Sequence, residues 1–466
     1  MSCRPNVLLF FTDDQRFDTI HALGNSRIHT PHLDALVARG TAFTRAHIPG
    51  GTCGAVCMPS RAMLHSGRTL FHLDGVGKEI PPAQTTLGEC LQAAGYATFG
   101  TGKWHNGRAA FARSFGAGDE IFFGGMGDHW NVPAYHFDPG GNYVRRHPYV
   151  ADPARSNQVV YRQCDHMELG RHSTDLFTEA ASRFVRERAD ARPFFMYVSL
   201  MAPHDPRTMP ERFRQMYDPD SIELPENFAP EHPIDTGALR IRDEMLAGFP
   251  RQPDEIRRHI AEYYAMITHL DDALGRLLAA LEKTGELDNT IIVFAGDNGL
   301  ALGQHGLLGK QNLYEHSVRV PMLMAGPGVP AGEQRDDLVY LLDIFPTICE
   351  MLGLAAPDSV EGRSFAPCLP AGGAGRDTLY LAYGKSIRGV SDGCHKLIEY
   401  ACGATQLFDL KQDPREMVNL AGEAENVALL AQMRRQLSAL AQAWDDRAHP
   451  LGGEFWSSRG DLGQAG

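Results

Sequence analysis

The sequence predicts an α/β fold: a large, mostly parallel sheet flanked by helices, with a smaller C-terminal α+β subdomain of antiparallel sheet plus helix. Short apolar runs alternate with amphipathic helical patterns up to about residue 350, which is typical of a sheet covered by helices on both faces. The pattern then changes at a Pro/Gly-rich linker, "PAGGAGRD", residues 370–377. We therefore predict a large domain over residues 1–370 and a subdomain over residues 376–466.

The individual elements follow from their residues in chain order. Continuous apolar runs rich in β-branched and aromatic residues predict buried strands at residues 6–12, 96–102, 193–203 and 290–296. Helical spacing of apolar residues, a Ser/Thr/Asp start and a closing glycine predict helices at residues 172–189 and 255–285. Beyond the linker we expect short strands at residues 378–384, 386–391 and 395–401, and a helix at residues 425–446.

Composition limits the classes of partner and the location. The 466 residues carry a formal charge of −13, without acidic runs, which favours solubility and argues against nucleic-acid and membrane partners. The apolar run Val7 to Phe11 is too short for a secretory signal, and no run approaches the roughly 18 residues of a membrane span. Nine scattered cysteines favour a reduced chain over a disulfide framework, so we expect a cytoplasmic protein.

Polar residues follow all four predicted strands of the large domain. Because ligands bind at the carboxyl ends of strands in open α/β sheets, these residues can converge on one crevice, although any one of them could be an ordinary loop residue. Their carboxylate and amide oxygens suit calcium or magnesium rather than zinc. The residues are Asp13 and Asp14, then Lys103 and His105, then His204, and finally Asp297 and Asn298.

The stretch "CGAVCMPSRAMLHSGR", residues 53–68, contains a helix start. Pro59 suits a first helical turn and Gly67 a helix end, so Cys57 should lie just before a helix N-terminus, exposed and with a lowered thiol pKa. Arg61 could lean back toward the same point. A zinc site is not predicted, because the neighbouring residues supply no further paired ligands.

Five motifs in order resemble those of type I, formylglycine-dependent sulfatases of the alkaline phosphatase superfamily. They extend over nearly the whole chain, from Pro5 to about Leu420. The resemblance implies that the chain is an enzyme, a sulfuric ester hydrolase. The motifs are "PNVLLFFTDDQ", "CMPSRAMLHSGR", "GTGKWHNG", "MAPH" and "VFAGDNGLALGQHGLLGKQNLYEHSVRVPM", and the tail "QLFDLKQDPREMVNL" resembles the C-terminal part of the family.

The resemblance implies a modified residue and a metal ion. By position, Cys57 would be oxidised to formylglycine (3-oxoalanine) by a formylglycine-generating enzyme, which reads Pro59 and Arg61, and Arg61 would also orient the aldehyde hydrate. Cys53 does not match the modified position and is expected to be a packing residue. A calcium ion, with magnesium as a possible substitute, would hold the oxygen at Cys57 and a sulfate oxygen, and its matching ligands are Asp13, Asp14, Asp297 and Asn298.

The resemblance also implies how sulfate is bound and released. Lys103, His105, His204 and Lys310 match the residues around the sulfate group, where the two lysines would neutralise its charge. His204 would protonate the departing alcohol, and His105 would remove a proton from the sulfated hemiacetal, so that sulfate leaves and the aldehyde returns.

Several further residues are candidates of lower rank. His305 is a possible substrate contact, although an ordinary loop histidine is the favoured interpretation. His269 falls within a helical pattern, and Glu315 and His316 fit a local structural network better than catalysis. Trp130, His129 and Arg207 are candidate walls for the alcohol part of the substrate, by position alone.

Three functions remain open on the sequence. The favoured one is hydrolysis of carbohydrate or aryl sulfate esters, because the segment leading to Lys310 resembles that of carbohydrate and aryl sulfatases. A phosphonate monoester or phosphodiester hydrolase shares the same nucleophile and metal ligands. A non-catalytic homologue that binds an anion or calcium is the remote alternative.

Overall fold

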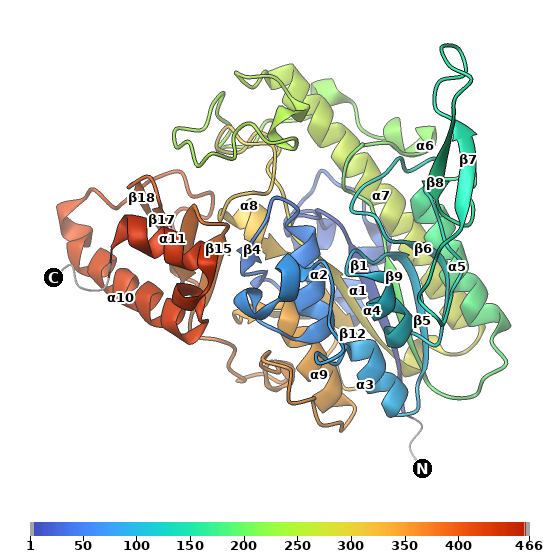
Figure 1. The fold of residues 1–466 in the computed structure, drawn as a ribbon. Coiled ribbons are helices and arrows are strands. Elements are labelled where there is room, and N and C mark those ends of the chain that lie inside the picture. Colours follow the sequence, from blue (N-terminus) through green and yellow to red (C-terminus); the bar gives the residue numbers. More distant parts are fainter. Residues whose placement is uncertain (1–3, 461, 463–466) are drawn as a thin grey trace.

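The computed structural model describes residues 4–460 and residue 462. Its centre is an eight-stranded sheet (Figure 1). The strand order is β13–β2–β12–β10–β1–β9–β5–β6. Within the described residues, β12 is the one antiparallel strand of this sheet, so the prediction of a mostly parallel sheet is confirmed. The strands are β1 (Asn6–Thr12), β2 (Gly40–Phe43), β5 (Ala97–Lys103), β6 (Ala117–Phe122), β9 (Phe194–Ser199), β10 (Thr290–Gly296), β12 (Met322–Ala325) and β13 (Glu333–Arg335).

Helices cover both faces of this sheet. This arrangement explains why the sequence of β1 is continuously apolar. Leu8 and Phe10 belong to one hydrophobic core, whereas Val7, Leu9 and Phe11 belong to the other. Successive side chains of a strand point to opposite faces, so both sets must be apolar when both faces are covered. One core includes α1 (Pro31–Arg39), α5 (Ser173–Glu187) and α7 (Pro253–Lys283), and the other includes α2 (Cys57–Ser66), α3 (Leu87–Ala93), α4 (Arg108–Ser114) and α9 (Ile344–Met351).

The C-terminal region forms a second sheet beside the first, with the order β18–β17–β16–β15–β4. The antiparallel strands and the helix predicted for this region are present (Figure 1). The sequence did not predict β4, β18 or the last helix. The elements are β4 (Gly50–Gly51), β15 (Leu379–Tyr383), β16 (Ile387–Ser391), β17 (His395–Tyr400), β18 (Thr405–Asp409), α10 (Val427–Ala443) and α11 (Pro450–Arg459).

Strand β4 lies a few residues before Cys57 in the chain and pairs in parallel with β15. Gly50 has a φ of +105°, and a Cβ atom there would lie 2.1 Å from the carbonyl oxygen of Ala382. A side chain at this position would therefore block the pairing. The second sheet thus contains residues from both sides of the predicted linker, and the linker at residues 370–377 remains a predicted domain boundary.

A buried charge cluster also joins the second sheet to the first part of the chain. Lys396 of β17 is fully buried, and its Nζ lies 3.0 Å from Oε1 of Glu315 and 2.9 Å from Oε1 of Glu416. Glu315 opens the short helix α8 (Glu315–Val318), close after Lys310 in the chain. Its place in this cluster agrees with the structural role expected for it.

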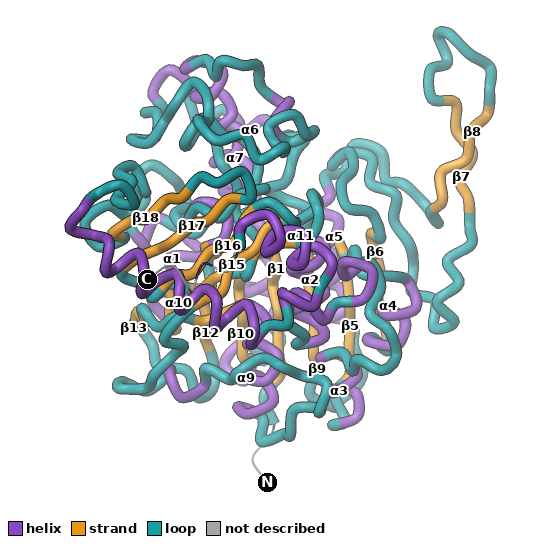
Figure 2. The backbone as a smooth tube through the Cα atoms, turned by 60° about the vertical axis from the view of Figure 1, so that its left-hand side comes forward, coloured by secondary structure: helices purple, strands orange, loops and turns teal. Residues whose placement is uncertain are grey.

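The remaining elements are short, and some of them, such as Ala46–His47 and Val339–Tyr340, are buried. The hairpin β7–β8 projects away from the rest of the molecule (Figure 2). Within the described residues, no helix combines the length and the apolar character needed to cross a membrane. These elements are β3 (Ala46–His47), β7 (Arg146–Val150), β8 (Val159–Gln163), β11 (Arg319–Val320), β14 (Val339–Tyr340) and α6 (Glu211–Arg214).

Candidate active site

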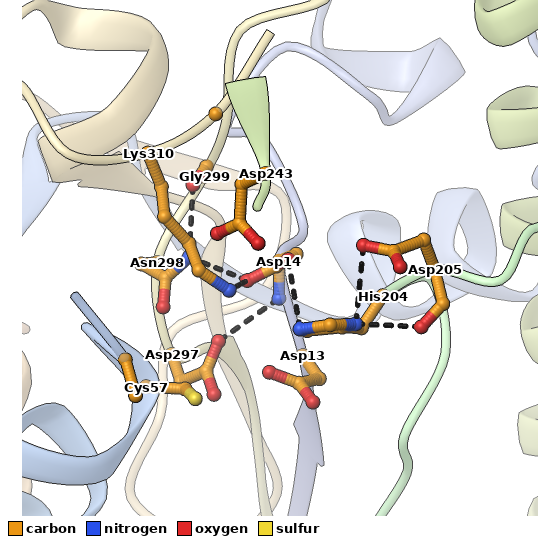
Figure 3. A network of polar contacts seen from close by, with 12 residues as sticks. Asp13, Asp14, Cys57, His204, Asp205, Asp243, Asp297, Asn298, Gly299 and Lys310 are labelled. Carbon is orange, nitrogen blue, oxygen red and sulfur yellow. Dashed lines mark hydrogen bonds and ion pairs between the residues drawn. The ribbon is translucent and has the colours of Figure 1, made fainter. Parts of the chain in front are cut away.

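The polar residues that follow the central strands meet at one edge of the sheet (Figure 3). Strands β10, β1, β9 and β5 are consecutive neighbours, so their carboxyl ends lie side by side. The backbone N–H of Asp14 donates to Oδ1 of Asp297 over 2.9 Å, and Lys103 Nζ forms a short ion pair with Asp13. His204 Nε2 lies 3.7 Å from Oδ2 of Asp14. The structure thus brings these residues together at one edge of the sheet, as the sequence predicted.

Cys57 is the first residue of α2, whereas the sequence predicted it just before the start of this helix. Its Sγ lies 3.5 Å from His105 Nδ1 and 3.6 Å from Lys103 Nζ. The side chain is only 2% exposed, and burial raises the pKa of the thiol to about 12, even though Lys103 and Lys310 lower it. The expectation of an exposed thiol with a lowered pKa is therefore wrong, because desolvation outweighs the helix N-terminus and the two lysines.

Arg61, one turn further along α2, is fully buried and ties three strand ends together. Its Nε donates to Oδ2 of Asp297 over 2.9 Å. Its Nη1 donates to the carbonyl oxygen of Lys103 and the hydroxyl of Tyr197, each over 3.1 Å, and to Ser199 Oγ over 2.5 Å. These partners belong to or follow β10, β5 and β9, so Arg61 fixes the geometry of the edge where the polar residues meet.

The acidic residues at this edge fit a hard divalent cation. Ligand atoms of Asp13, Cys57 and Asp297 all lie within 4.8 Å of one another. Oδ1 of Asp13 and Oδ1 of Asn298 are buried and have no hydrogen-bond partner. Burial and the charge of Asp13 raise the pKa of Asp297 to about 8. Buried carboxylate and amide oxygens left without partners match the ligands that calcium and magnesium prefer.

Two lysines bring positive charge to the same place. Burial lowers the pKa of Lys310, but the carboxylates around it, Asp14 first, raise it well above its usual value overall. Lys310 Nζ donates to Oδ1 of Asp14 over 2.5 Å. The pKa of Lys103 is also raised, by Asp13, against the effect of burial. Both lysines are therefore protonated, which gives an acidic protein a local site for an anion.

A cavity of about 440 Å³ lies against part of this cluster, whereas Lys103 and the predicted metal ligands Asp13, Asp14, Asp297 and Asn298 are not among its lining residues. Four of the predicted site residues line it: Cys57, His105, His204 and Lys310. The rest of the wall comes from loops without helical or strand periodicity. The sequence singled out none of its residues individually, although Gly125 and Met126 lie close in the chain to the wall candidates His129 and Trp130. The residues are Gly54, Ala55, Gly125, Met126, Ile241, Arg242, Asp243 and Gln311.

Comparison with known proteins places this arrangement in a family. A model described as Sulfatase matches residues 5–354, well over half of the chain. The chain belongs to the sulfatase family. A second model, described as N-sulphoglucosamine sulphohydrolase, C-terminal, matches residues 303–443. As a sulfatase, the chain is a sulfuric ester hydrolase of the alkaline phosphatase superfamily, as the resemblance of its motifs implied.

Relatives and solved structures match the chain over almost its full length. It is 30% identical to the multifunctional alkaline phosphatase superfamily protein PehA of Trinickia caryophylli, over 95% of each chain. It is 26% identical to an N-acetylglucosamine-6-O-sulfatase of Bacteroides thetaiotaomicron, over 95% of this chain and 87% of the relative.

The solved structures share the fold at lower identity. A protein in complex with its substrate D-glucosamine-2-N,6-O-disulfate gives a TM-score of 0.76 at 24% identity, over 96% of this chain and 99% of that protein. The phosphonate monoester hydrolase of Agrobacterium radiobacter gives 0.73 at 23% identity, over 95% of this chain and 96% of that enzyme.

His305 of this sulfatase lies outside the cavity at Cys57. It lines a separate cavity, where its ring stacks on Tyr314 with 4.1 Å between centroids. Its Nε2 lies 3.1 Å from Nδ2 of Asn227. The structure therefore does not bring His305 together with the other predicted site residues. Its surroundings agree better with the favoured interpretation of an ordinary loop histidine.

The other lower-ranked candidates also lie outside the lining of this cavity. His129 is buried, and its Nε2 lies 3.0 Å from the carbonyl oxygen of His204. Arg207 Nη1 lies 2.7 Å from His259 Nδ1. His269 is buried in α7, with Nε2 3.2 Å from Oδ2 of Asp175, as expected for a structural histidine. Trp130 and His316 do not line the cavity either.

Proposed function

We propose that this sulfatase hydrolyses carbohydrate or aryl sulfate esters with a formylglycine formed from Cys57 as the nucleophile and a calcium ion as cofactor. The observation that carries the proposal is the position of Cys57. Its Sγ lies within 3.6 Å of Lys103 Nζ and within 3.5 Å of His105 Nδ1, beside the buried carboxylates of Asp13 and Asp297. An atom attached to the β-carbon of residue 57 is thus surrounded by charge-stabilising and proton-accepting groups.

The residues of the chain have separate tasks in this reaction. The hydrated aldehyde would supply the attacking hydroxyl, and the cation would supply positive charge for the sulfate oxygens. Lys103 and Lys310, both protonated, would bind the sulfate group and stabilise the charge that develops during transfer. His105 would take the proton of the second hydroxyl at residue 57 when sulfate leaves.

His204 is positioned to protonate the departing alcohol. Its Nδ1 lies 2.7 Å from the backbone carbonyl oxygen of Asp205, which requires a proton on Nδ1. Nε2 is then the atom that faces Asp14 and can carry a proton to the leaving oxygen. The side chain lines the same cavity as Cys57, as this role demands.

The cation would be held by Asp13, Asp14, Asp297 and Asn298. Two of these residues have buried oxygens without partners, and the raised pKa of Asp297 shows the cost of placing its charge next to Asp13. A divalent cation would remove this repulsion. We expect a formylglycine-generating enzyme to be the partner that converts Cys57.

A phosphonate monoester or phosphodiester hydrolase is the second candidate. The name of the PehA relative describes a multifunctional protein, and the Agrobacterium radiobacter structure is a phosphonate monoester hydrolase. Sulfate and phosphonate esters both present tetrahedral anions, which the two lysines and the cation would bind in the same way.

One set of measurements tests the proposal. Mass spectrometry of the Cys57 peptide, in protein produced together with a maturation enzyme, should find the aldehyde. The same protein should release sulfate from 4-nitrophenyl sulfate or sulfated sugars faster than it cleaves phenyl phosphonate or phosphodiester analogues. Chelation should abolish turnover, and calcium should restore it. Phosphonate turnover without sulfate release would establish the second candidate, and a Cys57 that stays an unmodified thiol throughout, in protein from its native host, would favour a non-catalytic homologue.

A further inference from the structure

We propose that Asp243, held in place by Gln311 and Arg242, is the specificity-determining residue for the alcohol part of the substrate, and that it selects a neutral polyhydroxylated ring over an aryl group. The inference rests on the proposed sulfatase function and names the substrate class within it. The residue lies in the stretch between α6 and α7, far in sequence from the motifs of the family.

The Asp243 carboxylate has a fixed position relative to the nucleophile. Its Oδ2 accepts a hydrogen bond from Gln311 Nε2 over 2.7 Å, and its Oδ1 accepts one from Arg242 Nη1 over 3.3 Å. The same Gln311 Nε2 donates to the carbonyl oxygen of Gly54 over 2.8 Å, three residues before Cys57. Asp243 lines the cavity that contains Cys57, and Figure 3 shows its carboxylate near Lys310 and Asp14.

The carboxylate retains hydrogen-bonding capacity toward the cavity. An ionised carboxylate has about four acceptor positions, and two are used by Gln311 and Arg242. Sugar hydroxyls are donors that can fill the others. An aryl group offers no donor and would cover the carboxylate, which leaves a desolvated charge without a partner.

The balance of charge at this wall disfavours a second anionic group on the substrate. Arg242 forms a short ion pair with Asp205 in addition to its contact with Asp243. One guanidinium therefore faces two carboxylates. The sulfate group that reacts has Lys103 and Lys310 for its charge, but another sulfate or carboxylate next to Asp243 would be repelled by that carboxylate, whose neighbouring guanidinium is shared with Asp205.

Apolar side chains complete the wall. Met126 is 49% exposed and lines the cavity together with the half-buried Ile241. A pyranose ring has C–H groups that can pack on such side chains while its hydroxyls reach a carboxylate and an amide. Met126, Ile241 and Asp243 together therefore match a sugar better than a planar aromatic ring.

The test compares substrates that differ in their hydroxyl groups. The probes are glucose and galactose monosulfated at each hydroxyl position, with cyclohexyl sulfate and cyclohexylmethyl sulfate as hydroxyl-free counterparts. For the enzyme with converted Cys57, we expect kcat/KM for at least one hexose sulfate to exceed that of its counterpart by roughly 100-fold or more. Asp243→Asn should reduce this ratio at least roughly tenfold, because an amide is a weaker acceptor for hydroxyls than a carboxylate.

Asp235→Asn is the matched control, since Asp235 is an exposed carboxylate outside the cavity lining, and it should leave the ratio unchanged. The ratio does not depend on how much of each variant is folded. If the enzyme cleaves 4-nitrophenyl sulfate but no hexose sulfate faster than its hydroxyl-free counterpart, or if Asp243→Asn keeps the ratio, this inference fails alone. If the converted enzyme cleaves no sulfate ester, the proposed function and this inference both fail.

Discussion

Arg61 Nε donates a hydrogen bond to Oδ2 of Asp297 over 2.9 Å, and both side chains are fully buried. Oδ1 of the same carboxylate accepts the backbone N–H of Asp14. The helix that carries Cys57 is therefore fastened to the ends of β10 and β1 through one carboxylate. This contact sets the distance between residue 57 and the acidic residues that would hold a cation.

The substitution Arg61→Met should lower the free energy of unfolding and abolish turnover. It leaves Asp297 buried without its guanidinium partner, and loss of one partner of a buried pair costs about 3–5 kcal/mol. Urea denaturation should show the reduced free energy of unfolding, and sulfate release should be lost. Arg212→Met, which removes an exposed ion pair, is the control and should unfold at the same urea concentration as the wild type. A wild-type midpoint for Arg61→Met would contradict this role.

Cys57→Ala should abolish sulfate release, because it removes the only precursor of the nucleophile that we propose. Cys53→Ala should retain turnover, since Cys53 Sγ contacts the carbonyl oxygen of Ala55 rather than the site residues. Both variants should have melting temperatures close to that of the wild type, because each deletes a single sulfur atom. Turnover by Cys57→Ala at a measurable fraction of the wild-type rate would eliminate the proposed nucleophile.

Asp271 gives a prediction about pH. Burial raises its pKa from 3.8 to about 7, although the backbone N–H groups of Leu33 and His32 donate to it and lower it. The folded chain therefore holds this proton more tightly than the unfolded chain, so its contribution to stability is present at low pH and is lost as pH rises from about 4 to about 7.

Asp271→Asn should remove this pH-dependent contribution to stability, which amounts to about 1.4 kcal/mol for each unit of difference between the folded and unfolded pKa. Melting temperatures measured across that pH range should decline less steeply in the variant than in the wild type. Asp272→Asn, at the neighbouring and more exposed carboxylate, should keep the wild-type slope. Equal slopes for wild type and Asp271→Asn would show that this carboxyl group has an ordinary pKa.

Lys396→Met should destabilise the contact between the second sheet and the loop after Lys310. Glu315 and Glu416 would be left buried without the ammonium group that they share, at a cost of about 3–5 kcal/mol. Chemical denaturation should show this loss. The exposed Lys411→Met provides the comparison. If Lys396→Met is as stable as Lys411→Met, the cluster does not hold the two parts together.

The sequence was sufficient to predict the central strands and the residues at their ends. A strand buried on both faces needs a continuous apolar run, and the first polar residue after it marks the edge where ligands bind. Asp13, Lys103, His204 and Asp297 were found in this way, and the structure places all four at that edge.

Other features depend on contacts that leave no local signal. Asp243 lies in an irregular segment, and only the fold brings it to the cavity at Cys57. His305 shares a motif with Lys310, but the backbone between them directs it into another cavity. The pKa of Cys57 follows from burial among residues far away in the chain, which a helix start alone does not reveal.

The pairing of β4 with β15 has a consequence for how the protein is made. Gly50 and Gly51 cannot take their final place until the ribosome has synthesised Ala382 and Tyr383. The segment that leads into Cys57 must therefore wait, without its partner strand, through most of translation. During that interval Cys57, which is 2% exposed in the finished fold, would be accessible to the modifying enzyme that we propose. The late arrival of the C-terminal sheet would thus provide time for the proposed conversion of Cys57, which the finished fold would obstruct.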